Sequence, residues 1–232
     1  MTINMIQKHL FLLVCLSALL LLSCCTSNKY YSDFKRGKKE VDTLTILTPY
    51  VYVEFSTDQT FLKDDEQSKI LTQHIFNSSY SLLDKKYKLA GCMLPPDFIS
   101  ASDVSNLFSI LDNSDKNSEI PIPFFIQNLI KDNSSRYFLM VVFNGYYNAN
   151  YEPYYRMKSQ PGYMGPQSGY GIGIRVYPNT EFYNSDMRVL VFDNQKNIIV
   201  YYDKKYSKHT DPRIIEQVEK MTLDMFRPLY YK

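Results

Sequence analysis

The sequence predicts an α/β (α+β) fold, in which helices pack on a mixed or antiparallel sheet of about five strands. The first observation is the order of patterned segments: strand, helix, helix, helix, strand, long excursion, hairpin and helix. The second is composition, because 45% of the residues are hydrophobic and 22% are charged, which is typical of a globular chain. The third is length, since a chain of 232 residues suits one domain of ordinary size.

Strands are predicted where β-branched, aromatic and apolar residues alternate or run together. Residues 42–55 alternate, and Pro49 within them indicates a bulge or an edge position. Residues 137–143 are continuously apolar, which predicts a central position for a strand at 135–147. The other predicted strands are a short one within 86–96 and a hairpin that joins 187–193 to 197–203.

Helices are predicted where apolar residues recur at helical spacing, with polar residues between them. The predicted ranges are 64–84, 97–112, 121–131 and 210–230. The residues expected to face inward from the third helix are Phe125, Leu129 and Ile130. In the last helix, Asp211 is expected as the N-cap and Pro212 as the first helical residue, and Pro228 is expected to end the helix.

Residues 1–23 have the layout of a signal peptide, with Lys8 as the only full charge before an apolar run at 10–22. As a helix this run spans about 20 Å, against about 30 Å of bilayer hydrocarbon, so a permanent membrane span is the weaker interpretation. The run ends in Leu21-Leu22-Ser23-Cys24 and resembles the lipobox of bacterial lipoprotein precursors. The resemblance implies diacylglycerol on the Cys24 sulfur, cleavage after Ser23 and acylation of the new amino terminus. The alternatives are a plain secretory signal, a short membrane anchor, or Cys25 as the modified residue.

Residues 24–41 are predicted to tether a single domain, 42–232, to a membrane through lipidated Cys24. The tether is polar and lacks periodicity, and its basic residues either contact anionic head groups or belong to an ordinary solvated linker. The chain resembles lipoproteins of Bacteroidetes in its Lys, Asn and Tyr bias, and the surface-exported members of that group carry an acidic cluster after the modified cysteine. Because no such cluster follows Cys24, the predicted location is the periplasmic face of the outer membrane.

The order of elements also resembles a periplasmic α/β domain. That domain is shared by the amino-terminal part of the Tol-Pal beta-propeller protein and by the curli-secretion lipoprotein. The similarity lies in the opening strand and helix, and in the run VLVFDNQKNIIVYYD that leads into the last helix. It rests on pattern alone, so it implies a fold and no functional residues.

Residues 148–186 form a long excursion that holds five of the eight glycines and many tyrosines. A loop of this length within a compact domain is usually functional or disordered. Tyrosine provides much contact area for few torsions, which predicts a surface for an envelope protein or a glycan. The candidate contact residues are Tyr151, Tyr154, Tyr155, Tyr163 and Tyr170. The alternative is a hairpin arm that packs on its own domain, with a strand at 170–177.

No catalytic or metal-binding motif occurs in the sequence, so no cofactor and no metal are predicted. The histidines beyond the signal segment are His74 and His209, and neither has a partner at metal-ligand spacing. The net charge of +2 argues against nucleic-acid binding. The leading hypothesis is a non-enzymatic envelope lipoprotein that binds a partner or helps to assemble a complex. An oligomeric secretion or pore component and a hydrolase of unknown type are the alternatives, and pairing of Cys25 with Cys92 stays open.

Overall fold

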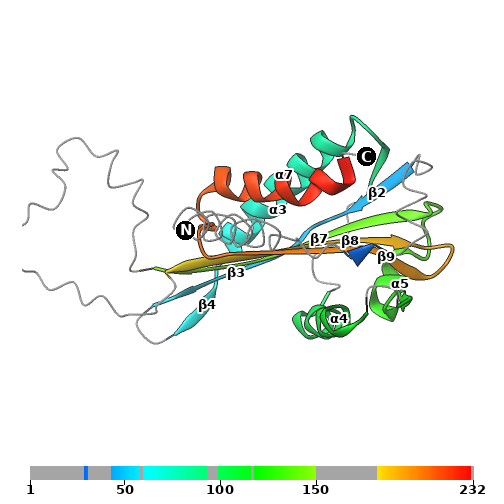
Figure 1. The fold of residues 1–232 in the computed structure, drawn as a ribbon. Helices are drawn as coiled ribbons and strands as arrows, with labels where there is room; N and C mark the ends of the chain where they lie inside the picture. The colour runs from blue at the N-terminus through cyan, green and yellow to red at the C-terminus, as the bar shows by residue number, and fades with distance from the viewer. Residues whose placement is uncertain are drawn as a thin grey trace, which may run out of the picture.

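In the part of the chain that the structure describes, four helices cover the two faces of one mixed sheet (Figure 1). The computed structural model describes residues 29–30, 43–57, 60–92, 99–115, 118–149 and 182–230. Within them the sheet has nine strands; helices α3 and α7 lie on one face, and α4 and α5 on the other. The predicted α+β class, with helices packed on a mixed sheet, is confirmed.

Strand β7 has parallel neighbours on one side and an antiparallel neighbour on the other. Strands β2 and β3 run parallel to β7, whereas β8 is antiparallel to β7 and β9 is antiparallel to β8. The strands are β1 (Lys29–Tyr30), β2 (Thr43–Leu47), β3 (Tyr50–Ser56), β4 (Phe61–Lys63), β5 (Lys88–Cys92), β6 (Ile120–Pro121), β7 (Tyr137–Asn148), β8 (Tyr183–Asp193) and β9 (Ile198–Ser207). The helices are α3 (Asp65–Leu83), α4 (Ala101–Asn113), α5 (Phe124–Ile130) and α7 (Ile215–Tyr230).

Strand β7 is the central strand that the apolar run at 137–143 predicts. Its side chains alternate between two hydrophobic cores, one under α3 and α7 and the other under α4 and α5. The residues that face α3 and α7 are Leu139, Val141 and Phe143, and those that face α4 and α5 are Phe138, Met140 and Val142. Burial on both faces explains why the run shows no alternation in sequence.

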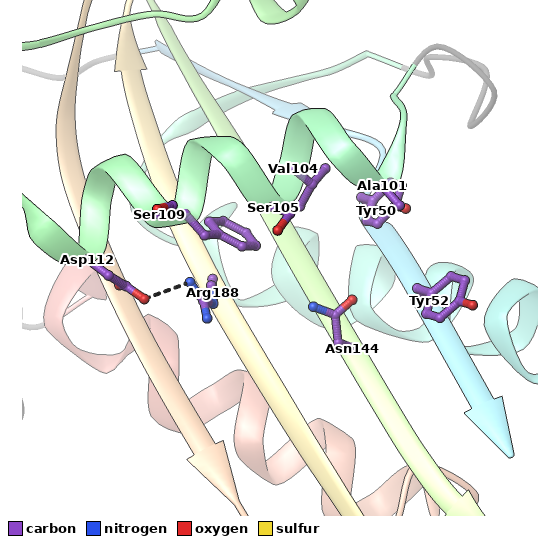
Figure 2. Close-up of a pocket in the computed structure, with 10 residues that line it drawn as sticks. Tyr50, Tyr52, Ala101, Val104, Ser105, Ser109, Asp112, Asn144 and Arg188 are labelled. Carbon is purple, nitrogen blue, oxygen red and sulfur yellow. Dashed lines mark hydrogen bonds and ion pairs between the residues drawn. The ribbon is translucent and has the colours of Figure 1, made fainter. Parts of the chain in front are cut away.

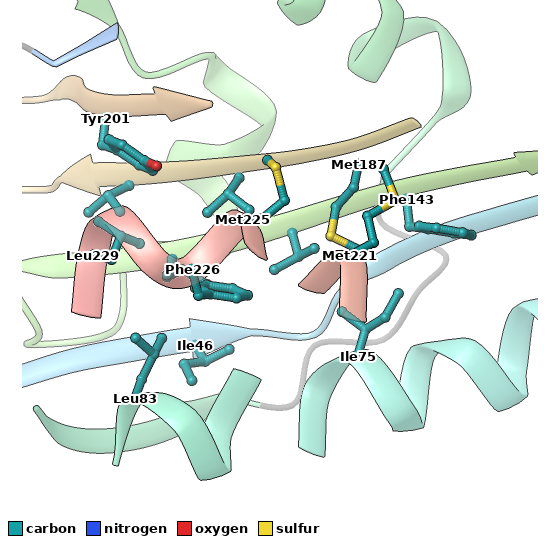
Figure 3. Close-up of a cluster of buried hydrophobic side chains, with 14 of the residues drawn as sticks. Ile46, Ile75, Leu83, Phe143, Met187, Tyr201, Met221, Met225, Phe226 and Leu229 are labelled. Carbon is teal, nitrogen blue, oxygen red and sulfur yellow. The ribbon is translucent and has the colours of Figure 1, made fainter. Parts of the chain in front are cut away.

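The α3–α7 core joins these two helices to the sheet (Figure 3). Helix α7 places Met221, Met225 and Phe226 against the sheet, and α3 adds Ile75 and Leu83 from the side. Each is almost fully buried. Burial of each such side chain contributes about 1.5–3 kcal/mol, so this core is a main source of the stability of the domain.

The predicted bulge at Pro49 is confirmed by the register against β7. Ile46 of β2 lies opposite Leu139, and Tyr50 of β3 lies opposite Val142. Four residues on one strand therefore span three on the other, which is the extra residue that defines a bulge. Because proline has no N–H to donate, it is accommodated where the ladder is already interrupted.

The first predicted helix is confirmed, and the starts of the other three need correction. Helix α3 follows Asp64, whose carboxylate accepts a hydrogen bond from Gln67 N at 2.9 Å as an N-cap. Helix α4 begins at Ala101 and not at 97, because Ser100 supplies the cap by accepting from Asp103 N at 3.1 Å. Residues 93–98 lie outside the described part of the chain. Helix α5 begins at Phe124 and not at 121. It buries Ile126 and Ile130 fully, whereas the predicted Phe125 and Leu129 are only partly buried.

Helix α7 begins at Ile215, so the prediction of Asp211 as N-cap and Pro212 as first helical residue is wrong. The Asp211 carboxylate accepts three hydrogen bonds from Arg213, from N at 2.9 Å, Nε at 3.0 Å and Nη2 at 2.8 Å. This closes a turn ahead of the helix. The prediction that Pro228 ends the helix is also wrong, because α7 continues to Tyr230. The carbonyl of Leu229 accepts hydrogen bonds from Lys86 Nζ and Tyr87 Oη, which hold the last turn in place.

The predicted hairpin is strands β8 and β9, joined through residues 194–197. Asn197 has φ 54, in the left-handed region that asparagine tolerates better than most residues. Strands β7 and β8 pair as far as Tyr147 and Tyr183, so both ends of the excursion leave from the same end of the sheet. Residues 150–181, including the predicted strand at 170–177, lie outside the described residues.

Two residues of the predicted tether join the sheet as strand β1. Lys29 lies opposite Tyr202 and Tyr30 lies opposite Tyr201, antiparallel to β9. β1 and β6 therefore pair with successive parts of the same edge of β9. None of the helices among the described residues is both long enough and apolar enough to cross a membrane.

Candidate binding cleft beneath helix α4

A cleft of about 400 Å³ lies between α4 and the sheet (Figure 2). Its volume falls within the range of about 300–1,000 Å³ typical of small-molecule sites. Strands β3, β7 and β8 supply its floor, and α4 supplies its wall. The lining residues are Tyr50, Tyr52, Ala101, Val104, Ser105, Phe108, Ser109, Asp112, Asn144 and Arg188.

Strand register brings the floor residues together. Tyr52 of β3 lies opposite Asn144 of β7, and Asn144 lies opposite Asp186 of β8. The neighbouring row places Tyr50 opposite Val142 and Val142 opposite Arg188. Because side chains alternate along a strand, the polar members of both rows point to the α4 face.

Three polar groups on the floor are available to a ligand. Asn144 is half-buried, and its side-chain amide makes no hydrogen bond within the described part of the chain. The hydroxyls of Tyr50 and Tyr52 likewise have no hydrogen-bond partner among those residues. Burial raises the pKa of Tyr50 despite the opposing charge of Lys63, so this phenol stays protonated and can donate. Together the three side chains offer both donors and acceptors, beside two aromatic rings.

One end of the cleft is closed by an ion-pair network centred on Arg188. Its Nε donates to Asp186 Oδ2 at 2.9 Å, and its Nη1 donates to Asp112 Oδ2 at 3.2 Å and to Tyr202 Oη at 3.1 Å. The guanidinium also lies over the ring of Phe108, 4.1 Å from the centroid. Lys204 Nζ lies 2.9 Å from Asp112 Oδ1, so two carboxylates face two cations and their formal charges cancel.

The groups of this network keep fixed protonation states near neutral pH, Asp112 as the carboxylate and Tyr202 as the phenol. Burial raises the pKa of Asp112, but hydrogen bonds from Tyr202 and Lys204 and the charge of Arg188 outweigh it, and the pKa lies below its usual value. Burial and the hydrogen bond to Asp112 raise the pKa of Tyr202, whose hydroxyl donates to Asp112 Oδ1 at 2.7 Å. The closed end is therefore a rigid, charge-balanced wall, and the ligand-binding capacity lies with the tyrosines and Asn144.

The polar side chains that line the cleft are hydroxyls, one amide, one guanidinium and one carboxylate. Its lining contains no histidine and no cysteine, and its one carboxylate, Asp112, is engaged by cations and a hydroxyl. The described residues contain no group of three or more His, Cys, Asp or Glu side chains that could hold a metal ion. His74 lies outside the cleft, on α3, with Nδ1 3.5 Å from Glu219 Oε1 of α7.

The candidate site residues that the sequence singled out are not among those that the structure describes. The predicted lipidation residue, Cys24, lies outside the described residues, as do the candidate contact residues Tyr151, Tyr154, Tyr155, Tyr163 and Tyr170. Sequence reasoning missed Asn144 and Arg188. A signal for Arg188 was present, because it is the one charge within the otherwise apolar run at 187–192. The tyrosines at 50 and 52 were visible as an alternating pair, but nothing in sequence placed them beneath a helix.

The comparisons with known proteins found fold similarity only. No protein-family model and no curated protein matches the chain. Among solved structures, the PelC dodecamer from Paraburkholderia phytofirmans is 7% identical with a TM-score of 0.35, covering 82% of this chain and 89% of that chain. Lipoprotein GNA1162 from Neisseria meningitidis is 8% identical with a TM-score of 0.30, covering 78% and 94%.

A third similar structure is a DUF4136 family protein from Bacteroides thetaiotaomicron. It is 12% identical with a TM-score of 0.34, and the match covers 89% of this chain and 96% of that chain. These values describe a distant likeness of fold to bacterial proteins that include a lipoprotein. They carry no functional residue over to this chain.

Proposed function

We propose that this protein is a lipid-anchored component of the bacterial cell envelope, placed on the periplasmic face of the outer membrane. The observation that supports the anchor is the apolar run at 10–22, which ends in Leu21-Leu22-Ser23-Cys24. The folded α+β domain that follows serves as a binding module. Several acyl chains on the first mature residue give durable attachment, since each buried CH₂ contributes about 0.8 kcal/mol.

Replacing Cys24 by alanine is expected to abolish incorporation of radioactive palmitate, because the thiol that accepts the lipid is gone. Cells that produce the wild-type chain are labelled, and the protein is then isolated and counted. Cys25→Ala is the matched control, which removes the neighbouring thiol and should label as wild type does. An unlabelled wild type would end the anchor proposal. If only the Cys25→Ala variant lost the label, the lipid would be assigned to Cys25.

The cleft beneath α4 supports a ligand class for the binding module, namely an uncharged oligosaccharide. Tyr50 and Tyr52 provide aromatic surface and hydroxyls, and Asn144 provides an amide that can donate and accept. The charges at the closed end already cancel within the protein, which leaves no net charge to attract an ionic ligand. A hydroxyl-rich, neutral ligand satisfies the polar groups without desolvating a charge.

Tyr52→Ala and Asn144→Ala are each expected to weaken binding of a neutral oligosaccharide by about tenfold, which corresponds to about 1.4 kcal/mol. Chitohexaose and maltohexaose are the neutral probes and polygalacturonate is the acidic one, with affinities measured by isothermal titration calorimetry. Tyr80→Ala is the matched control, because it removes a partly exposed tyrosine from α3 on the other face of the sheet. Equal affinity in the cleft variants and the control, or binding of the acidic probe alone, would refute the ligand class.

A further inference from the structure

We propose that the outer edge of strand β9 faces the lipid surface to which the protein is anchored, so that the domain has a fixed orientation on the membrane. The inference rests on the proposed lipidation of Cys24. It goes beyond that proposal because a lipid anchor on a flexible linker leaves every face of a domain equally able to approach the bilayer.

Covalent geometry limits how far β1 can lie from the anchor. Lys29 is the fifth residue after Cys24, and each step along the chain adds at most about 3.6 Å, so the two Cα atoms are within about 18 Å of each other. Lys29 lies opposite Tyr202 in the sheet, and neighbouring strands are about 4.8 Å apart. The middle of β9 is therefore held within about 23 Å of the first mature residue.

The opposite edge of the sheet lies on the other side of β7 from β1. The sheet order places β8, β7 and β2 between β9 and β5, so β5 lies four strand spacings, or about 19 Å, from β9. Because the anchor segment enters the sheet at the β9 side, the sheet extends away from the anchor. This asymmetry singles out one edge as the side nearest the lipid.

The chemistry of the β9 edge suits an anionic lipid surface. Residues 204–208 are Lys204, Lys205, Tyr206, Ser207 and Lys208, and Tyr206 is 53% exposed. Lys204 and Lys205 are about 40% exposed although they contact Asp112 and Asp224. A lysine near an anionic surface contributes up to about 1 kcal/mol, and Lys204 and Lys205 contribute less than this because each already pairs with a carboxylate. Tyrosine is enriched where an apolar region meets water.

The orientation is tested by quenching a fluorophore with nitroxide-headgroup lipids. The full-length lipidated protein is reconstituted in vesicles of phosphatidylcholine and phosphatidylglycerol, with Cys25 and Cys92 replaced by serine. The fluorophore is attached through Tyr206→Cys on β9 or through Lys88→Cys on β5. Quenching at position 206 is expected to be at least about twofold stronger than at 88, because the two edges are about 19 Å apart. Equal quenching, or stronger quenching at 88, overturns the orientation.

Strand β1 is tested by a matched pair of double variants. Lys29→Pro with Tyr30→Pro removes both backbone donors of β1 and should equalise quenching at the two positions. Ser27→Pro with Asn28→Pro makes the same change of composition ahead of the strand and should keep the difference. A difference that survives the first pair overturns the role of β1. Failure of the wild type to float with the vesicles would instead refute the anchor, which keeps the two proposals separate.

Discussion

Replacing Gly145 by alanine is expected to lower the free energy of unfolding by about 1–3 kcal/mol, the range typical of overpacking. Gly145 lies in β7 between β3 and β8, and a Cβ atom there would stand 2.7 Å from Pro212 Cβ and 3.0 Å from Phe143 Cε1. Pro212 cannot withdraw cheaply, since its carbonyl accepts a hydrogen bond from Gln67 Nε2 at 2.7 Å and Asp211 beside it is held by Arg213. The close approach of the turn before α7 thus depends on a residue without a side chain.

Gly91→Ala is the matched control, because it makes the same change in strand β5. There the new Cβ would meet only Phe76 Cζ, at an ordinary distance of 3.6 Å. Alanine restricts the unfolded chain, so this variant is expected to be neutral or more stable by up to about 1 kcal/mol. Urea denaturation of both variants measures the difference. A loss at Gly91 as large as the loss at Gly145 would show that the strand, and not Pro212, rejects the methyl group.

A double-mutant cycle isolates the contact itself. Combining Gly145→Ala with Pro212→Gly removes the nearest atom that the new methyl group meets. The loss of stability in the double variant is expected to be smaller than the sum of the two single losses by about 1 kcal/mol or more, because residues in contact commonly show such coupling. If the two single losses of stability simply add in the double variant, the steric explanation is contradicted.

Replacing Asp203 by asparagine is expected to stabilise the protein at pH 7.5 by about 2–3 kcal/mol, at about 1.4 kcal/mol per pKa unit. Asp203 of β9 is only 6% exposed, and burial raises the pKa of its carboxyl to about 6. Hydrogen bonds from Lys204 N and Tyr201 Oη, and the charge of Lys205, lower this pKa only in part.

The sign of the pH dependence follows from proton binding. Below the ordinary pKa of 3.8 the Asp203 carboxyl is protonated in both the folded and the unfolded state. As pH rises, the unfolded chain releases this proton first, so the folded state binds more protons and its stability falls until pH passes about 6. Asparagine stays neutral, and the gain from Asp203→Asn should therefore be absent near pH 3.5 and complete near pH 7.5.

Asp224→Asn provides a control of opposite sign. A hydrogen bond from Lys205 lowers the pKa of Asp224, so its carboxylate stabilises the folded state above the usual pKa and this contribution is lost as pH falls. The asparagine variant should be less stable than wild type at pH 7.5, and the difference should shrink in acid. Urea unfolding at intervals between pH 3.5 and 7.5 measures both variants. A gain from Asp203→Asn that does not change with pH would refute the raised pKa.

The elements that could be predicted from sequence are those whose signal is local. The apolar run at 137–143 identified the central strand, since burial on both faces removes polar residues from both sets of positions. Pro49 identified the bulge between β2 and β3, because a missing N–H must lie where the ladder is broken. The start of α3 is likewise local, as the Asp64 side chain caps the helix three residues along the chain.

The start of α7 could not be predicted in this way. Asp211 followed by Pro212 is a good local helix start, but the Asp211 carboxylate pairs with Arg213 and the turn packs against Gly145. Two contacts thus override the local preference, one made within the turn and one made by a distant strand. The candidate residues in the excursion and the lipidated Cys24 stay predictions, because they lie outside the described residues.

The sequence by itself determined the kind of protein this is: an α+β domain behind an apolar segment that ends in a lipobox-like motif. Only the tertiary structure decided which residues line the cleft beneath α4 and that β1 pairs with the β9 edge of the sheet. Tyr52, Asn144 and Arg188 come from three different strands, and the pairing register alone sets them on one floor beneath α4. Register and packing are set by contacts between residues far apart in the chain, and a pattern of neighbouring residues does not contain them.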